Sequence, residues 1–252
     1  MTQFYFPELK DVKQQQININ SIDEVKHIKK SYRAKVGDLL RLFDGKGCIV
    51  KAKIRKITAQ NIILDIIEKN FFQKENFEII ICQGLIKIDR FELVLEKSTE
   101  IGVDKIVPLE LENIVVKKEK FIKKYERFKK IILESAKQSN RIFLPEIDNV
   151  MSLEEIFVNH NNGLNIILYK NSEKKLKDIE NEIRSSKKIK IFVGPEGDFS
   201  KKEIEFLREK NATYFINLTN NVLRSETAAI VALGTILQFK RKNGDGGNSL
   251  GL

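Results

Sequence analysis

The sequence is poor in the side chains that bind metals and form disulfides. It contains only two cysteines, Cys48 and Cys82, and two histidines, His27 and His160, among 252 residues. None of the four has metal-ligand spacing, so zinc sites, disulfide frameworks and Ser-His-Asp catalysis have little to build from. We therefore expect no metal cofactor.

Two nucleotide-binding motifs are also missing. Neither the glycine-rich turn GxGxxG nor the phosphate loop GxxxxGK followed by Ser or Thr occurs in the chain. Dinucleotide, ATP and GTP sites of the familiar kinds are thus unsupported, and any ligand must be held differently.

Long hydrophobic runs are absent as well. No stretch reaches the roughly 18 apolar residues that a membrane span requires. The opening residues MTQFYFPELKD lack the basic start and apolar run of a signal peptide. We expect a soluble, cytoplasmic protein without a membrane partner.

The composition is nevertheless that of a folded, basic protein. Hydrophobic residues make up 42% of the chain, enough for a core, and the length is typical of one or two domains. Lys and Arg number 45 against 35 Asp and Glu, a net charge of +10. This excess favours a polyanionic partner over an acidic small molecule.

Residues 1–70 have the pattern of a small β-rich domain. Asp-Gly within FDGKG, residues 43–47, supplies the positive φ that a hairpin needs. In the following strand, apolar residues alternate with Lys51, Lys53 and Arg55, which puts a basic row on the solvent face. The row is either a solvated face that keeps the sheet soluble or an RNA-facing stripe. We expect strands at residues 3–6, 15–19, 38–43, 48–57 and 61–67, and a helix near 21–30.

From residue 71 onward, apolar runs alternate with helical periodicity. This pattern is typical of a parallel sheet covered by helices on both faces. We expect strands at residues 77–83, 105–109, 164–169, 189–194 and 213–218. We expect helices over 89–101, opened by Asp89 and Glu92, over 121–138, and after Ser200, capped with Glu203. The second domain is then residues 71–242, followed by a flexible tail at 243–252.

The last expected helix has no polar face. After RSET, residues 224–227, it runs AAIVALGTIL, and a helix that is apolar all round must be covered on every side. The chain's own sheet can cover one side, so we predict that a second subunit covers the other in a homodimer. Burial under the chain's own loops is the alternative.

Two loops at neighbouring strand ends carry the strongest signals of a site. GPEGDFS, residues 194–200, leaves an apolar strand at the edge where open parallel sheets bind ligands. Its two glycines let backbone amides approach a ligand, and Glu196 adds a carboxylate. An ordinary strand-turn-helix joint would have the same pattern.

The second loop is LTNNVLRSETA, residues 218–228. Arg224 and Glu226 stand beside a wholly apolar segment, where charges are costly unless they are paired or used. They are either a mutual ion pair that caps the helix or part of a site. Because both loops leave adjacent strands at one edge, their side chains can converge on one ligand.

Together, FVGPEGDFS and LTNNVLRSETAAIVAL resemble the two signature blocks of the RsmE family. These are SPOUT-class methyltransferases that methylate N3 of a uridine in 16S ribosomal RNA. LFDGKG, after the basic VKHIKKSYRAKVGD, is similar to the family's N-terminal PUA-like RNA-binding domain. FELVLEKSTEIGVDKIVPL resembles its first helix-strand unit, and ILESAKQSNRIFLPEI its EAxxQSxR block. The match covers about residues 4–239.

The resemblance implies an α/β fold with a SPOUT trefoil knot in the parallel sheet and a small N-terminal PUA-like β-barrel. It also implies bound S-adenosylmethionine and a homodimer in which the knots meet. The cofactor-binding residues would be Leu168, Gly194, Glu196, Gly197, Leu218 and Leu223. We expect RNA at Arg33, Lys35, Lys87, Lys97 and Arg141, which otherwise are ordinary surface charges.

The catalytic candidates that follow are Arg224 and Glu226. Arg224 would stabilise negative charge that develops on the uracil carbonyls, and Glu226 would orient Arg224. Uridine N3 carries a proton at neutral pH, and its acceptor could be Glu226, Glu196 or a water.

Three positions depart from the family pattern. Asp198 replaces the second glycine of GPEGG, Asn221 replaces an arginine, and Gln3 replaces an early arginine. The changes at Asp198 and Asn221 leave one alternative open, a catalytically inactive rRNA-binding ribosome-assembly factor. A SPOUT enzyme that methylates a ribose 2′-hydroxyl is a further alternative, which differs in the acceptor.

Overall fold

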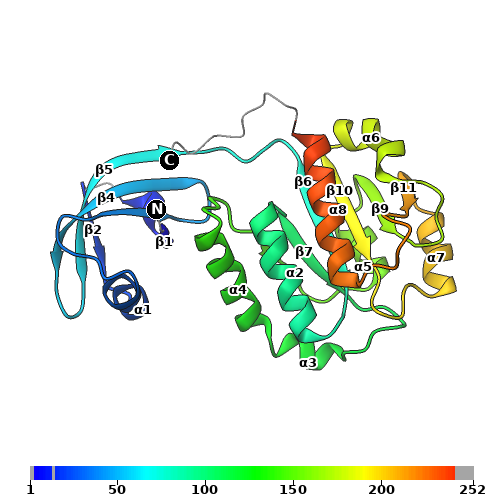
Figure 1. Cartoon of the computed structure of the whole chain (residues 1–252), viewed down its shortest axis with the longest axis horizontal. Helices are drawn as coiled ribbons and strands as arrows, with labels where there is room; N and C mark the ends of the chain where they lie inside the picture. Colours follow the sequence, from blue (N-terminus) through cyan, green and yellow to red (C-terminus); the bar gives the residue numbers. More distant parts are fainter. Residues whose placement is uncertain (1–2, 13–14, 242–252) are drawn as a thin grey trace. The chain divides into compact units, whose positions relative to one another are not determined.

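The computed structural model describes residues 3–12 and 15–241, and it consists of two compact units (Figure 1). The first unit holds the residues up to Lys74 together with Leu133–Leu144, and the second holds Glu75–Ile132 and the described residues from Pro145 onward. The expected tail at 243–252 lies outside the described residues.

The first unit is built on a five-stranded sheet in the order β1-β3-β4-β5-β2. Its elements are β1 (Gln3–Tyr5), β2 (Gln16–Ile19), α1 (Ile22–Lys26), β3 (Leu39–Phe43), β4 (Cys48–Ile57) and β5 (Ile62–Phe71). The predicted hairpin joins β3 to β4, and Asp44 Oδ1 stabilises its turn by accepting from Lys46 N and Cys48 N, at 2.7 and 3.0 Å. The alternation in β4 is confirmed, because Val50, Ala52 and Ile54 are buried while the basic row is exposed.

Gln3 ties the segment Leu133–Leu144 to this sheet. Its side chain is fully buried, and Nε2 donates to the carbonyl oxygens of Ala136 and Arg141, at 2.9 and 2.8 Å. Gln3, one of the three residues that depart from the family pattern, therefore stabilises the first unit. Sequence reasoning assigned the segment to the second domain, because contacts between residues so far apart leave no local pattern.

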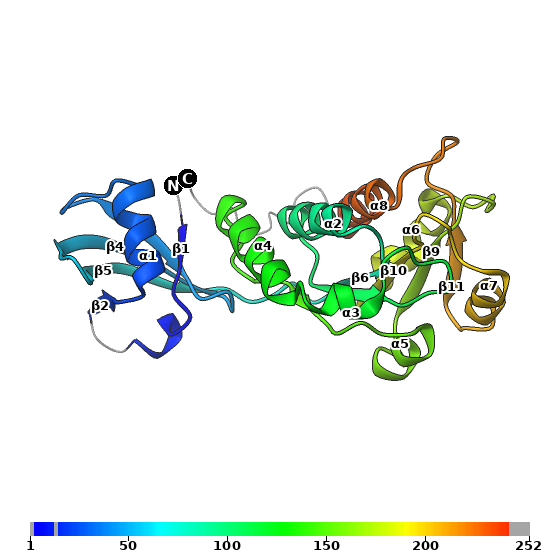
Figure 2. The ribbon, with the colours of Figure 1, turned by 90° about the horizontal axis from the view of Figure 1, so that it is seen from below.

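The second unit contains the predicted parallel sheet, with six strands in the order β11-β9-β10-β6-β7-β8. The strands are β6 (Glu78–Gly84), β7 (Lys105–Leu109), β8 (Glu146–Ile147), β9 (Leu164–Leu168), β10 (Lys188–Val193) and β11 (Thr213–Ile216). The helices are α2 (Ile88–Ile101), α3 (Lys118–Ile122), α4 (Tyr125–Gln138), α5 (Leu153–Asn159), α6 (Glu180–Ser185), α7 (Lys201–Arg208) and α8 (Ser225–Lys240). The part of α4 from Leu133 onward belongs to the first unit. Helices lie on both faces of the sheet, with α2 and α8 on one and α5 on the other (Figure 2). The expected α/β class is confirmed, and the trefoil knot stays a prediction.

Alternate residues of the central strands build the two faces of this core. Ile80, Cys82 and Phe192 pack with residues of α5 and α7. Burial raises the pKa of the Cys82 thiol well above its usual range. Lys190 is also fully buried on β10, where its Nζ donates to the His160 carbonyl oxygen and desolvation lowers its pKa.

Two helix boundaries differ from the predicted ones. The expected helix over 121–138 is two helices, α3 and α4, separated by a turn in which Lys124 N donates to the Phe121 carbonyl oxygen at 2.9 Å. Asp89 does not cap α2, because the helix already begins at Ile88 and its capping position is Lys87. The capping box of α7 is confirmed: Ser200 N donates to Glu203 Oε2 at 2.7 Å, and Glu203 N donates to Ser200 Oγ at 3.3 Å.

Helix α8 is covered on one side by its own chain. Ala229, Leu233 and Ile236 are fully buried, in contact with the sheet and with α2 and α6. On the other side Val231 is 40% exposed, and Thr227 and Gln238 are exposed too. The described loops of this chain therefore leave that side open. Within residues 3–12 and 15–241, no helix combines the length and apolarity needed to cross a membrane.

Candidate functional site

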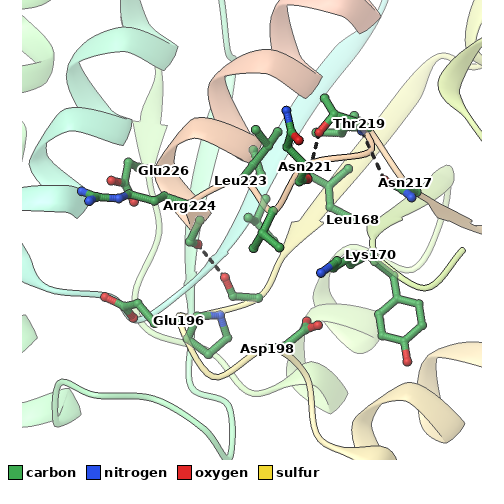
Figure 3. A pocket seen from close by; sticks show the side chains of 18 of the residues that line it. Leu168, Lys170, Glu196, Asp198, Asn217, Thr219, Asn221, Leu223, Arg224 and Glu226 are labelled. Carbon is green, nitrogen blue, oxygen red and sulfur yellow. Dashed lines mark hydrogen bonds between the residues drawn. The ribbon is translucent and has the colours of Figure 1, made fainter.

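Three neighbouring strands end level with one another and form the floor of a cavity. In the sheet register, Leu168 of β9 lies beside Val193 of β10 and Ile216 of β11. The loops that leave these strands, with the start of α2, enclose about 600 Å³ (Figure 3). This volume is within the range of small-molecule sites. Both signature loops line it, as their position at one sheet edge led us to expect.

The cavity has an apolar interior and a charged rim. Leu168, Val193, Ile216, Leu218 and Leu223 supply the apolar surface. The charged lining residues are Lys87, Arg90, Lys170, Glu196, Asp198, Arg224 and Glu226. In the part of the chain that the structure describes, no cluster of three or more His, Cys, Asp or Glu side chains could hold a metal ion. Such a lining suits an organic ligand with both apolar and polar parts.

A hydrogen-bonded chain fixes the two loops to each other. Gln83 Nε2, at the end of β6, donates to Ser225 Oγ at 2.8 Å, and Ser225 Oγ donates to the Gly194 carbonyl oxygen at 2.5 Å. Ser225 is the first residue of α8, so the start of this helix is joined to the turn after β10. Sequence reasoning missed this link, although Gln83 is a polar residue directly after the apolar run Ile79–Cys82.

The turn after β10 is held tightly from outside the cavity. Asn113 Nδ2 donates to the carbonyl oxygens of Gly197 and Asp198, at 3.1 Å each. A Cβ on Gly197 would come within 2.9 Å of the Asn113 side chain, so this glycine faces Asn113, whereas Gly194 and Glu196 line the cavity. Asp198 adopts φ +58°, and its Oδ1 accepts from Phe199 N at 2.8 Å. An aspartate therefore fits the left-handed position where the family pattern has glycine.

The ion pair at the cavity joins Glu226 to Arg90 and not to Arg224. Glu226 has a side chain that is only 7% exposed, and its Oε1 lies 3.4 Å from Nη1 of Arg90. Arg224 lines the cavity and is exposed, and it forms no ion pair with any described residue. The alternative of a mutual ion pair between Arg224 and Glu226 is therefore not realised, and the expected direct contact by which Glu226 would orient Arg224 is not formed. Arg90, in the first turn of α2, is the residue that pairs with Glu226. Sequence reasoning missed this residue.

The residues predicted to bind RNA have different surroundings. Arg33 and Lys35 are exposed in the first unit, and Lys87 is exposed at the rim of the cavity. Lys97 donates to Glu96 and Glu100, at 2.7 and 3.0 Å, and these hydrogen bonds raise its pKa. Arg141 donates from Nε to the Phe143 carbonyl oxygen at 2.6 Å. Arg33, Lys35 and Lys87 thus have the freer side chains.

Comparisons with known proteins agree with this architecture. The family described as RNA methyltransferase domain matches residues 73–237, and the one described as RNA methyltransferase PUA domain matches residues 19–67. Ribosomal RNA small subunit methyltransferase E of Rickettsia conorii is 30% identical, over 87% of this chain and 88% of that protein.

Two solved structures share the fold over nearly their whole length. Ribosomal RNA small subunit methyltransferase E from Neisseria gonorrhoeae, bound to S-adenosyl methionine, gives a TM-score of 0.81 at 26% identity, with 94% and 96% of the two chains covered. A Legionella pneumophila protein in complex with the cofactor SAM also gives 0.81, at 28% identity and with 93% and 96% covered. The resemblance seen in the sequence motifs is confirmed, and the chain belongs to the RsmE family of ribosomal RNA small subunit methyltransferases.

Proposed function

We propose that this protein transfers a methyl group from S-adenosylmethionine to N3 of a specific uridine in 16S ribosomal RNA. The observation that carries the proposal is the convergence of both family signature loops on one cavity at the ends of β9, β10 and β11. Family membership and the S-adenosyl methionine in the Neisseria gonorrhoeae structure support the choice of methyl donor.

The lining of the cavity fits this methyl donor. Leu168, Leu218 and Leu223 offer an apolar surface to an adenine ring. Glu196 is exposed at the rim and can accept hydrogen bonds from hydroxyl or ammonium groups. When bound, S-adenosylmethionine supplies a methyl group on a positively charged sulfur. Gly197, which faces Asn113, would act through the shape of the turn.

Arg224 is our candidate for the group that acts on the uracil. Its guanidinium is exposed at the cavity and has no acidic partner among the described residues, so it can donate to an anionic carbonyl oxygen. Loss of the N3 proton leaves negative charge on the uracil ring and carbonyls, and a preorganised cation stabilises that charge. Glu196, which lines the cavity, or a water would take the proton, because Glu226 is engaged with Arg90.

RNA is expected to bind through phosphate contacts with Arg33, Lys35 and Lys87. Each phosphate contact adds roughly 0.7 to 0.9 to the slope of log affinity against log salt concentration. An R33Q/K35Q variant should therefore lower this slope by about 1.4 to 1.8. Filter binding of 16S rRNA between low and physiological salt measures the slope.

The matched control removes two exposed lysines elsewhere. Lys177 and Lys187 are exposed in the second unit, and K177Q/K187Q changes the net charge equally. This variant should keep the wild-type slope. Equal slopes for all three proteins would reject the assignment of Arg33 and Lys35.

We also propose that the open side of α8 is covered by a second copy of the chain. Val231 is a large apolar side chain that is 40% exposed within the apolar run AAIVAL, residues 228–233, of this helix. A V231K variant should convert the dimer into single subunits in sedimentation velocity, because a buried unpaired charge is costly. V158K on α5, where Val158 is 75% exposed, should stay dimeric. A wild-type protein that sediments as a single subunit would contradict this proposal.

Mass spectrometry of small-subunit rRNA tests the proposed reaction in cells. We expect N3-methyluridine in rRNA from cells with the protein and its loss when the gene is deleted. Restoration by the wild-type protein and not by an Arg224→Ala variant would link the modification to the cavity. An unchanged nucleoside profile would favour the inactive assembly factor, and loss of a 2′-O-methylated nucleoside would favour the ribose methyltransferase.

A further inference from the structure

Arg90 is the cation that compensates the buried carboxylate at the start of α8. It lies in the first turn of α2, lines the cavity and has a side chain that is 41% exposed. Its Nη1 is 3.4 Å from Glu226 Oε1, and its Nε is 3.7 Å from Asp89 Oδ2. Arg90 thus joins an exposed acid of its own helix to a buried acid of α8.

Glu226 needs this partner because its side chain is 7% exposed. A buried charge is costly unless it is paired, and the N-terminus of a helix supplies only part of the compensation. The other charged groups around the cavity are Lys87 at the N-cap of α2, Lys170 after β9, Glu196 and Asp198 after β10, and Arg224 at the N-cap of α8. Among the described cationic residues around the cavity, only Arg90 makes an ion pair with Glu226.

The pairing has a consequence for Arg224, the N-cap residue of α8, which stands two positions before Glu226. If Arg90 were absent, Arg224 would be the cation nearest in sequence to the uncompensated carboxylate. A guanidinium held by Glu226 could not at the same time donate fully to an anionic substrate.

We propose that Arg90 is a positioning residue that binds Glu226 and thereby keeps the Arg224 guanidinium free for the target uracil. This inference rests on the proposed function, and it adds a residue from a different part of the chain to the site. It leaves Glu226 without a direct part in the reaction, because its carboxylate is held by Arg90.

A double-mutant cycle with methyl transfer as the readout tests the proposal. The R90M variant should lower kcat by about 100-fold, because misplacement of a group near the reaction centre has effects of that size. Its dissociation constant for S-adenosylmethionine, measured by calorimetry, should stay within about threefold of wild type, as should KM. In an E226Q background, R90M should change kcat by no more than about threefold, because the neutral amide does not capture Arg224.

Two further variants separate this role from a structural one. R90K, which keeps a positive charge near Glu226, should recover most of the kcat lost in R90M. R127M removes an arginine that pairs with Glu92 of α2 on the surface, so it is a matched control and should keep wild-type kcat. Thermal unfolding of each variant shows whether it is folded.

The outcomes that overturn the proposal are distinct. An R90M effect of equal size with Glu226 and with Gln at that position would mean that Arg90 acts directly on substrate. An R90M variant with wild-type kcat, or an E226Q variant without turnover, would also overturn it. A wild-type protein that methylates a different atom would refute the N3 assignment while leaving the cycle informative for Arg90.

Discussion

Replacing Arg224 with alanine is expected to lower kcat by about 100-fold or more, the usual cost of one lost preorganised donor. The guanidinium is exposed at the cavity and unpaired among the described residues, so its removal deletes no ion pair of the fold. Stability and cofactor affinity should therefore change little. Single-turnover methylation of 16S rRNA, with calorimetric titration of S-adenosylmethionine, separates these quantities.

The control for this prediction is Arg224→Lys. A lysine keeps the charge but loses the planar fork that can donate to a carbonyl oxygen in two directions. We expect its kcat to lie between those of alanine and arginine. Turnover of the alanine variant within about tenfold of wild type would remove Arg224 from the mechanism.

Replacing Gly84 with alanine should weaken cofactor binding by at least about tenfold, because a site displaced by a fraction of an ångström loses much of its complementarity. Gly84 is the last residue of β6, and a Cβ there would lie 2.8 Å from Pro195 N and 2.9 Å from Pro195 Cδ. The backbone of the turn cannot yield as a flexible side chain would. The methyl group therefore pushes the turn that carries Gly194 and Glu196.

Ile79→Val on the same strand is the matched control. Ile79 is fully buried near the opposite end of β6, and this change costs about 0.5–1.5 kcal/mol of stability without crowding the turn. The valine variant should therefore bind S-adenosylmethionine like wild type. Equal affinities of the Gly84→Ala variant and wild type would show that the turn does not set cofactor binding.

The sequence was sufficient to predict the main architecture because its patterns are local. Alternation in β4, apolar runs in the parallel strands and the Ser200–Glu203 capping box each depend on neighbours within a few residues. The position of both signature loops at one sheet edge follows from parallel strands alone. Motif blocks added the family, which no periodicity could give.

The contacts that complete the site were not predictable in this way. Arg90 reaches Glu226, and Gln83 reaches Ser225, only because the fold brings β6, α2 and α8 together. A charge beside an apolar helix indicated that Glu226 needs a partner, but Arg224 was the nearest cation in sequence. Arg90 is the partner of Glu226 because α2 packs against α8.

The most direct test is transfer of a deuterated methyl group by the purified protein. 16S rRNA and small ribosomal subunits are incubated with labelled S-adenosylmethionine, digested to nucleosides and analysed by mass spectrometry. We expect label on N3 of uridine with wild-type protein and its loss with the Arg224→Ala variant. Label on a ribose oxygen, or no label in either substrate despite bound S-adenosylmethionine, would contradict the assignment of this cavity to uridine N3 methylation.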